Sequence, residues 1–145
     1  MAGPQECGLI SRQVIARITG LDEFRATGSR PGEPFDRCIV RKEGGDAIGA
    51  ALSITFDNPS ALTVEELEGT KQHDRGQDLP ADLGPGFTAQ IEGEDGMKTY
   101  AYAWTPDASR RLSIWIAPGA PGRDHRADAI ELVRQLKPIL FKESG

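Results

Sequence analysis

Three short segments in the second half of the chain have the alternating side chains of β-strands, and the links between them have only hairpin length. They span residues 87–92, 97–105 and 111–117. Two earlier strands, 37–43 and 47–57, flank a turn made of two glycines and an aspartate. Links this short join antiparallel neighbours, because a parallel crossover needs about a dozen residues or more. The pattern therefore predicts a mostly antiparallel five-stranded sheet.

Capping signals predict an N-terminal helix and a middle helix. Ser11 fits the N-cap position of the first helix, and Gly20 supplies the left-handed residue that ends it. Thr63 with Glu66 forms a capping box before a middle helix over about residues 64–72.

Apolar residues that recur at helical spacing from Asp124 onwards predict a C-terminal helix. Pro138 is expected to end this helix or to kink it near its last turn, because proline has no amide hydrogen. Turn formers and polar residues fill 21–36 and 73–86, where we expect an irregular loop and a polar connection. Helices packed on an antiparallel sheet place the chain in the α+β class.

The size and charge of the chain bound its domain count and its partners. With 145 residues and 38% hydrophobic content, it fits a single domain, expected over residues 7–141. Residues 1–6 read as a disordered N-terminal linker or an expression remnant, and 142–145 as a tail. A formal net charge of -5 argues against nucleic-acid binding and against docking on anionic lipid. No apolar run reaches the roughly 18 residues of a membrane-spanning helix, and we expect a monomer.

The two cysteines lie where a disulfide would tie an N-terminal helix to the sheet. Cys7 precedes the first helix, and Cys38 opens the first predicted strand. Closing the glycine- and proline-rich loop between them would remove roughly 3.5 to 4 kcal/mol of unfolded-chain entropy. Two separate buried thiols are the alternative, because free cysteine is often a core residue.

Several motifs in the chain resemble those of a family of small actinobacterial lipoproteins. That family has a "C-x-L-L-[ST]" helix opening, a Thr-Gly close and a second cysteine on the first strand. The run from Leu79 to Phe87 also resembles a turn of that family, although Pro85, Gly86 and Phe87 replace its usual Asp-x-Ala. The motifs that carry the resemblance are Cys7-Gly8-Leu9-Ile10-Ser11, Val14-Ile15-Ala16, Thr19-Gly20 and Cys38.

The resemblance implies export to the cell envelope, often with a lipid-modified cysteine ahead of the domain. It also implies a disulfide between Cys7 and Cys38. We therefore expect an extracytoplasmic, membrane-anchored lipoprotein whose leader lies upstream of Met1. The family has no known function and brings no catalytic residues with it. Related envelope lipoproteins have folds similar to the PsbP and Mog1 proteins, which is the expected architecture.

Three aromatic residues alternate along one strand, so they share one face of it: Tyr100, Tyr102 and Trp104. If the turn pairs Trp104 with Leu112, these rings face the core beneath the last helix. The opposite face would then present the candidate binding surface, which comprises Trp115, Ala101 and Ala103. Either a second helix packs on these small residues, or the face is a shallow apolar groove anchored by Trp115. A slip of one residue in the register would exchange the two faces.

Motifs of catalysis are few. The chain has no nucleophile elbow, dinucleotide fingerprint or P-loop, so no cofactor is predicted. Neither histidine has metal-ligand spacing to a cysteine, so no metal is predicted. His73 and His125 each neighbour an aspartate that could orient the imidazole, although a solvated histidine near a helix end is the simpler interpretation.

The leading prediction is therefore a non-enzymatic envelope or secreted domain that binds a partner protein, a wall component or a lipid. An accessory or sensor module that modulates a membrane partner is the second interpretation. A hydrolase or isomerase with a histidine–carboxylate pair is the third.

Overall fold

The computed structural model describes residues 5–6, 10–21, 23–28, 36–42, 51–93, 96–117, 122 and 124–141. Its strands are β1 (Gln5–Glu6), β2 (Ile10–Ser11), β3 (Phe24–Gly28), β4 (Arg37–Lys42), β5 (Leu52–Asp57), β6 (Gln77–Asp78), β7 (Gly86–Gly93), β8 (Gly96–Trp104) and β9 (Arg111–Ile116). Seven of them form one antiparallel sheet in the order β3-β4-β5-β9-β8-β7-β6, and β1 pairs with β2 separately.

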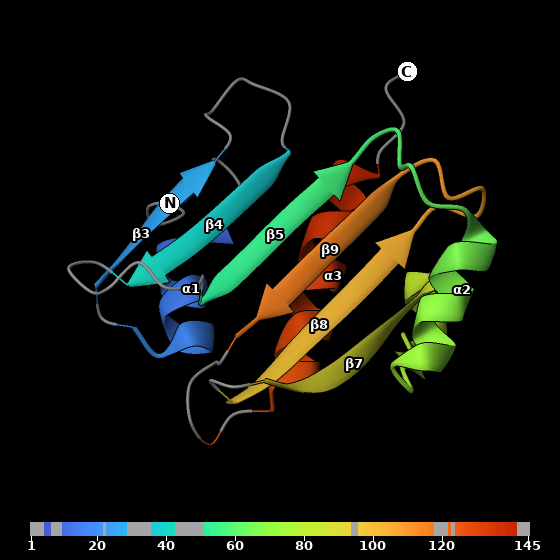
Figure 1. Ribbon diagram of the computed structural model, residues 1–145. Helices are drawn as coiled ribbons and strands as arrows, with labels where there is room; N and C mark the ends of the chain where they lie inside the picture. The colour runs from blue at the N-terminus through green and yellow to red at the C-terminus, as the bar shows by residue number, and fades with distance from the viewer. Residues whose placement is uncertain are drawn as a thin grey trace.

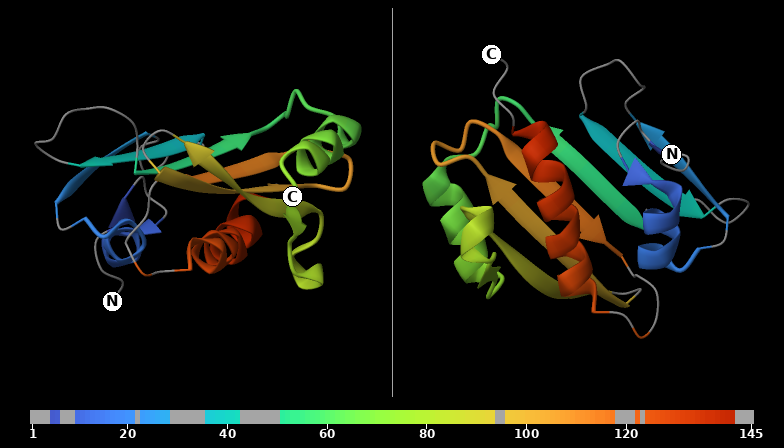
Figure 2. Two further views of the ribbon diagram at one scale, coloured as in Figure 1. Left: turned by 60° about the horizontal axis from the view of Figure 1, so that its bottom comes forward. Right: turned by 180° about the vertical axis from the view of Figure 1, so that it is seen from behind.

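The helices divide between the two sides of this sheet. They are α1 (Arg12–Thr19), α2 (Val64–His73), α3 (His125–Leu140) and the short 3-10 helix η1 (Ala81–Leu83). In Figure 1, α1 and α3 lie behind the large sheet. Figure 2 shows α1 and α3 together on one side, while α2 lies on the other side near the β7 edge. The α+β class and the antiparallel sheet are thus confirmed.

The predicted helix signals act as expected. The Ser11 hydroxyl accepts a hydrogen bond from the Val14 amide, and Gly20 closes α1 in the left-handed conformation at φ 75°. The capping box of Thr63 and Glu66 is complete at the start of α2.

The start of α3 is also confirmed, since the Asp124 side chain caps it by accepting from the Ala127 amide. Pro138 lies inside the last turn, and α3 continues to Leu140 before Phe141 caps it. The missing amide of Pro138 therefore falls close to the end of the helix, where it interrupts little.

Each side of the sheet has its own apolar cluster. The larger cluster joins α1 and α3 to the inward residues of β3, β4, β5, β8 and β9. The smaller cluster lies on the side of α2 and is mostly aromatic. Its buried members are Leu67, Phe87, Ala89, Tyr100, Trp104 and Ala108.

The predicted number of strands is wrong, because the described sheet has seven rather than five. The additional strands are β3 and β6, which form its two edges. In β3, Phe24 and Ala26 pack toward the larger cluster while Arg25 between them faces away. This short strand lies within 21–36, where an irregular loop was expected, and β6 and η1 lie within the expected polar connection. An edge strand forms backbone hydrogen bonds with one neighbouring strand only, and edge strands are often short.

The predicted register between β8 and β9 is wrong by one residue. Trp104 pairs with Arg111, not with Leu112. Because successive side chains point to opposite faces, this shift turns the large aromatic residues of β8 away from α3 and toward α2. The small residues Ala101 and Ala103 consequently face α3 and are fully buried.

Cys38 is fully buried in the larger cluster and is not a free thiol. Cys7 lies outside the described residues, so its pairing with Cys38 stays a prediction. Among the described helices, none is long and apolar enough to cross a membrane.

Candidate functional site

One side of the sheet is only partly covered by described structure. Figure 1 looks onto this side, where α2 lies over the β7 edge and leaves β4, β5 and β9 in view. Side chains that alternate outward on β4, β5, β9 and β8 line it. We call this surface the open face, and it comprises Arg37, Ile39, Arg41, Ser53, Thr55, Trp115 and Tyr102, while Ser113 on the same side is buried.

Trp115 is the largest side chain of the open face and is half-buried. Tyr100 stacks on one side of its indole, with ring centroids 4.3 Å apart and planes inclined by 16°. On the other side, β5 places Ser53 directly opposite Trp115, and Thr55 follows on the same face. Because both of these side chains are short, the second face of the indole has no large described neighbour on β5. The open face thus holds a preoriented aromatic platform beside a strip of hydroxyl groups.

Tyr102 extends the platform along β8. Its ring lies 6.4 Å from that of Trp115 in an edge-on arrangement, and the Arg111 guanidinium lies 5.5 Å from its centroid. Arg111 is held in turn by Asp57, at 2.5 Å from Nη2 to Oδ2. Burial raises the pKa of Tyr102, and the nearby Arg111 opposes this effect. At neutral pH Tyr102 therefore keeps its hydroxyl proton and can donate a hydrogen bond to a ligand.

Arginines border the hydroxyl strip on its far side. Arg25 and Arg41 lie directly opposite each other on β3 and β4, and both are exposed. Like charges in such a pair are unfavourable, and neither guanidinium has a carboxylate within ion-pair distance in the described part of the chain. An anionic group bound between them would relieve this repulsion.

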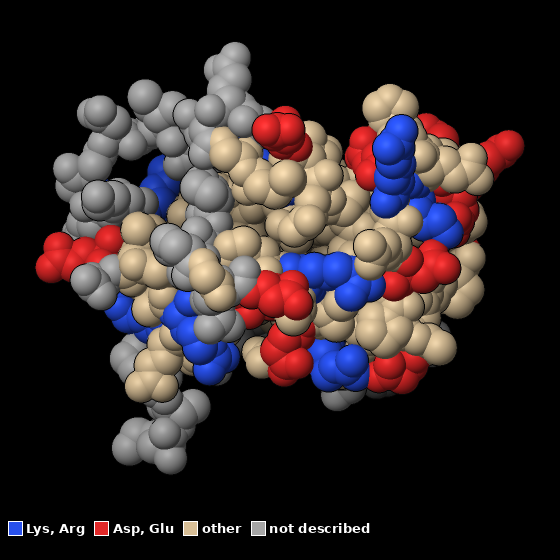
Figure 3. Space-filling model, turned by 90° about the horizontal axis from the view of Figure 1, so that it is seen from below, with Lys and Arg blue, Asp and Glu red and all other residues tan. Residues whose placement is uncertain are grey.

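Among the described residues, no well-exposed large hydrophobic side chain lies on the open face. The large hydrophobic residues that are well exposed are Val64 on α2, Met97 on β8 and Ile139 on α3. They are therefore spread over three elements. Figure 3 shows acidic and basic side chains interspersed over the end of the molecule seen from below. The described part of the open face therefore combines hydroxyl and arginine side chains with the half-buried Ile39 and one aromatic platform.

The three residues of the predicted binding surface do not share one face of the sheet. Trp115 lies on the open face and is partly exposed there. Ala101 and Ala103 do not share that face, because both are buried beneath α3 with no exposed area. Tyr100 and Tyr102, which were assigned to the core below α3, are the true neighbours of Trp115. The alternation along β8 showed that Tyr100 and Tyr102 share one face and Ala101 and Ala103 the other. Which of these faces carries Trp115 depends on the pairing of β8 with β9.

His73 lies at the end of α2, next to the partly buried hydrogen-bonded pair of Asp74 and Tyr100. Its Nδ1 is 3.0 Å from Asp74 Oδ1, and the Tyr100 hydroxyl donates to the other oxygen of Asp74. The bond from Tyr100, with a smaller contribution from His73, lowers the pKa of Asp74. The His73 side chain is 88% exposed, so solvent surrounds the imidazole. The arrangement ties the end of α2 to β8.

His125 lies in the first turn of α3, with Nδ1 3.6 Å from Asp128 Oδ2. That nitrogen is buried and has no hydrogen-bond partner in the described structure. His73 and His125 belong to different helices on opposite sides of the sheet (Figure 2) and do not form a joint site. Two cavities, one beside α3 and one beside Asp74, are lined without either histidine. In the described residues, no group of three His, Cys, Asp or Glu lies close enough to hold a metal ion.

Comparison with protein-family models, with curated proteins and with solved structures finds no match for this chain. The lipoprotein resemblance and the PsbP- and Mog1-like architecture accordingly stay predictions. Function has to be inferred from the chemistry of the molecule itself.

Proposed function

We propose that this chain is a non-enzymatic domain of an exported, envelope-associated protein that binds an anionic glycan of the cell wall on its open face. Trp115 would stack on a sugar ring, and the arginines at the border would bind the acidic groups of the polymer. The stacked pair of Trp115 and Tyr100 beside a hydroxyl strip carries the proposal.

The aromatic platform suits a sugar ring for two reasons. A pyranose presents a flat array of C–H groups, which packs on an indole with large buried area and few rotors to order. Tyr100 already fixes the orientation of Trp115, so little side-chain entropy is lost on binding. Ser53 and Thr55, which are both partly exposed, then supply hydroxyl groups that can donate and accept at the edges of the ring.

Charge favours an acidic polymer over a neutral one. Arg25 and Arg41 form a close cationic pair across β3 and β4. Guanidinium groups bind carboxylates and phosphates through paired hydrogen bonds, which fix the orientation of the ligand as well as its affinity.

A glycan also fits this face better than a protein or a lipid does. The core of a protein interface is usually apolar, and lipid binding needs an apolar surface or cavity at the site. In the described part of the chain, the open face instead combines hydroxyl groups and arginines with a single aromatic platform and the half-buried Ile39, and the well-exposed large hydrophobic residues lie elsewhere.

The envelope location rests on the lipoprotein resemblance of the Cys7 and Cys38 motifs. A disulfide to Cys7 would be maintained in an oxidising compartment outside the cytoplasm. An extracytoplasmic domain would meet wall polymers directly.

Co-sedimentation with purified bacterial peptidoglycan that retains its wall polysaccharides tests the proposal. The wild-type protein should sediment with the polymer, and Trp115→Ala should weaken binding by about tenfold or more, as loss of a central aromatic anchor does. Ile139→Ala is the matched control, because it removes an exposed apolar side chain on α3. Trp115→Phe, which keeps a ring, should retain part of the binding.

Circular dichroism and thermal unfolding establish that each variant is folded. Wild-type protein that stays in the supernatant would refute the proposal. Equal binding by Trp115→Ala and the wild type would refute the assigned face.

A further inference from the structure

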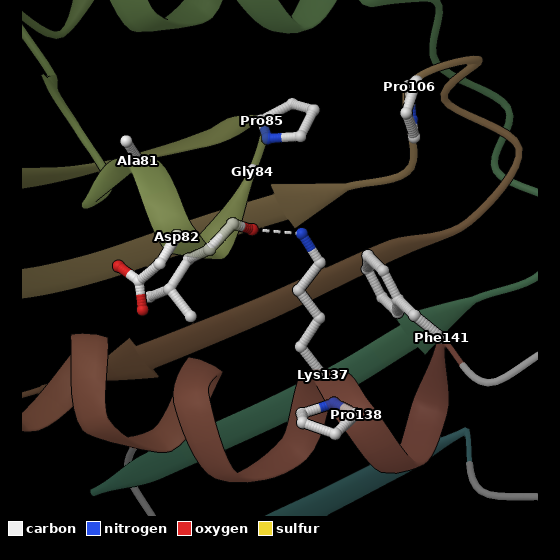
Figure 4. Close-up of a pocket in the computed structure, with 9 residues that line it drawn as sticks. Ala81, Asp82, Gly84, Pro85, Pro106, Lys137, Pro138 and Phe141 are labelled. Carbon is white, nitrogen blue, oxygen red and sulfur yellow. Dashed lines mark hydrogen bonds between the residues drawn. The ribbon is translucent and has the colours of Figure 1, made fainter.

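A second site lies on the other side of the sheet, at the C-terminal end of α3. A cavity of about 550 Å³ opens between η1, the turn after β8 and the last turn of α3. Figure 4 shows Lys137 reaching across it toward the backbone of η1, with the Phe141 ring beside it. We call it the Lys137 pocket, and its lining residues are Ala81, Asp82, Leu83, Gly84, Pro85, Pro106, Lys137, Pro138 and Phe141.

The walls of the Lys137 pocket are largely apolar and stiff. Pro85, Pro106 and Pro138 come from three separate segments, and proline has a fixed φ angle and no amide donor. Phe141 adds an aromatic wall at the end of α3. A cavity with such walls is largely preformed, which is typical of small-molecule sites.

Lys137 is the only lysine among the described lining residues, and its ammonium group lies within this largely apolar surface. Its Nζ donates a hydrogen bond to the Leu83 carbonyl and lies 5.2 Å from the centroid of the Phe141 ring. Burial lowers the pKa of Lys137, which reflects the loss of water around the ammonium. An ammonium has three donors, so two remain for other acceptors.

The charge of Lys137 is not neutralised by a carboxylate within ion-pair distance in the described part of the chain. Asp82 is the one acidic residue of the lining, and its Oδ2 pairs with Arg134. Figure 4 shows the Asp82 carboxylate pointing away from the Lys137 ammonium. Among the described residues, the pocket therefore presents a single positive charge with no carboxylate partner.

Gly84 brings the backbone of η1 close to this charge. It has φ 76°, a conformation that side chains rarely adopt, and a Cβ at this position would lie 2.8 Å from Lys137 Nζ. Glycine thus keeps open the space around the ammonium, into which an anion could enter.

A purely structural role for Lys137 explains its position less well than anion binding does. A lysine in the last turn of a helix is favoured by the helix dipole when it stays near the terminal carbonyls. Lys137 instead crosses to the Leu83 carbonyl, and its ammonium stays in an apolar cavity without an acidic partner. Because Lys137 is half-buried, its ammonium has lost part of its water, and an anion that enters the pocket would compensate for that loss.

We propose that the Lys137 pocket binds a small organic monocarboxylate with an apolar body, such as a medium-chain fatty acid. The carboxylate would pair with the Lys137 ammonium, and the apolar chain would pack against the prolines and Phe141. One cation in the lining matches one negative charge, which favours a carboxylate over a multiply charged phosphate. The site is independent of the open face, so either proposal can fail without the other.

Isothermal titration calorimetry with sodium decanoate tests the proposal, with decanol as the uncharged probe of the same chain length. Decanoate should bind wild-type protein at one site, and Lys137→Met should weaken it by about tenfold to a hundredfold, as loss of a charged hydrogen-bonded partner does. Decanol should bind more weakly and equally to both proteins. Lys98→Met is the matched control, since it removes an exposed lysine on β8 and should bind decanoate as the wild type does.

A nuclear magnetic resonance titration of the wild type keeps the test valid if Lys137→Met does not fold. Decanoate should shift the side-chain signals of Lys137 and the ring signals of Phe141. The proposal is overturned if millimolar decanoate leaves these signals unchanged. It is equally overturned if Lys137→Met and Lys98→Met weaken decanoate binding to the same extent.

Discussion

Leu67 is predicted to hold α2 on the sheet almost alone. Every residue of α2 is described, and Leu67 is the only buried one among them. It packs in the aromatic cluster with Phe87 and Trp104, both of which are buried as well. The substitution Leu67→Ala therefore removes the main apolar contact between this helix and the sheet.

The cost can be estimated from the burial. Complete burial of a leucine side chain is worth about 1.5–3 kcal/mol, and a cavity left behind raises the cost of Leu→Ala to about 2–5 kcal/mol. The rings that surround Leu67 are held by their own strands and cannot close on the cavity freely. We therefore expect a loss of about 3 kcal/mol in the free energy of unfolding, or roughly 6–12 °C in Tm.

Urea unfolding followed by tryptophan fluorescence measures this loss. Val64→Ala is the matched control, because Val64 lies on the same helix with 37% of its surface exposed and should cost less than about 0.5 kcal/mol. If both substitutions cost the same, α2 is not anchored through Leu67, and the assignment of the aromatic residues to the α2 side is wrong.

Three further predictions concern the register, the end of α2 and the cysteines. Ala101→Leu should destabilise the protein by about 1–3 kcal/mol in chemical unfolding, because Ala101 is fully buried beneath α3; an unchanged stability would contradict the register of β8. The pKa of Asp74 is lowered by the bond from Tyr100, so its contribution to stability is present above about pH 4 and is lost as pH falls through the folded-state pKa. Stability measured from neutral pH down to about pH 2 should consequently fall less steeply for Asp74→Asn than for the wild type, and parallel curves would contradict this role. Alkylation without reductant should leave both thiols unmodified if Cys7 and Cys38 are bonded, whereas free reaction of either in the native protein would exclude the bond.

Local signals in the sequence were sufficient to locate the three α-helices, although not the short helix η1. Ser11, Gly20 and the Thr63–Glu66 box act within a few residues of themselves, so their effect does not depend on the rest of the fold. The edge strand β3 was missed because its five residues carry only one large apolar side chain, Phe24, between segments rich in turn formers.

The pairing of β8 with β9 could not be decided by hydrophobic pattern. Both faces of β8 are apolar, one with large rings and the other with alanines, so either register buries an apolar face. The turn determines the answer: Thr105 donates its amide to the Arg110 carbonyl, and this pair sets Trp104 opposite Arg111. A shift of one residue was enough to place Ala101 in the wrong surface.

The Lys137 pocket had no local sequence signal at all. Its walls come from η1, from the turn after β8 and from the end of α3, which are far apart in the chain. Pro138 was expected to break the helix, whereas it lines a cavity from within the last turn.

Mapping the glycan site by nuclear magnetic resonance tests the central claim most directly. Soluble glycan fragments of bacterial cell wall would be added to nitrogen-15-labelled wild-type protein. The account predicts that the indole signal of Trp115 and the amide signals of Ser53 and Thr55 shift together and saturate, while the indole of Trp104, which is 1% exposed, stays in place. If the Trp115 indole signal does not move, or if the shifts gather elsewhere on the molecule, the open face is not the glycan-binding surface.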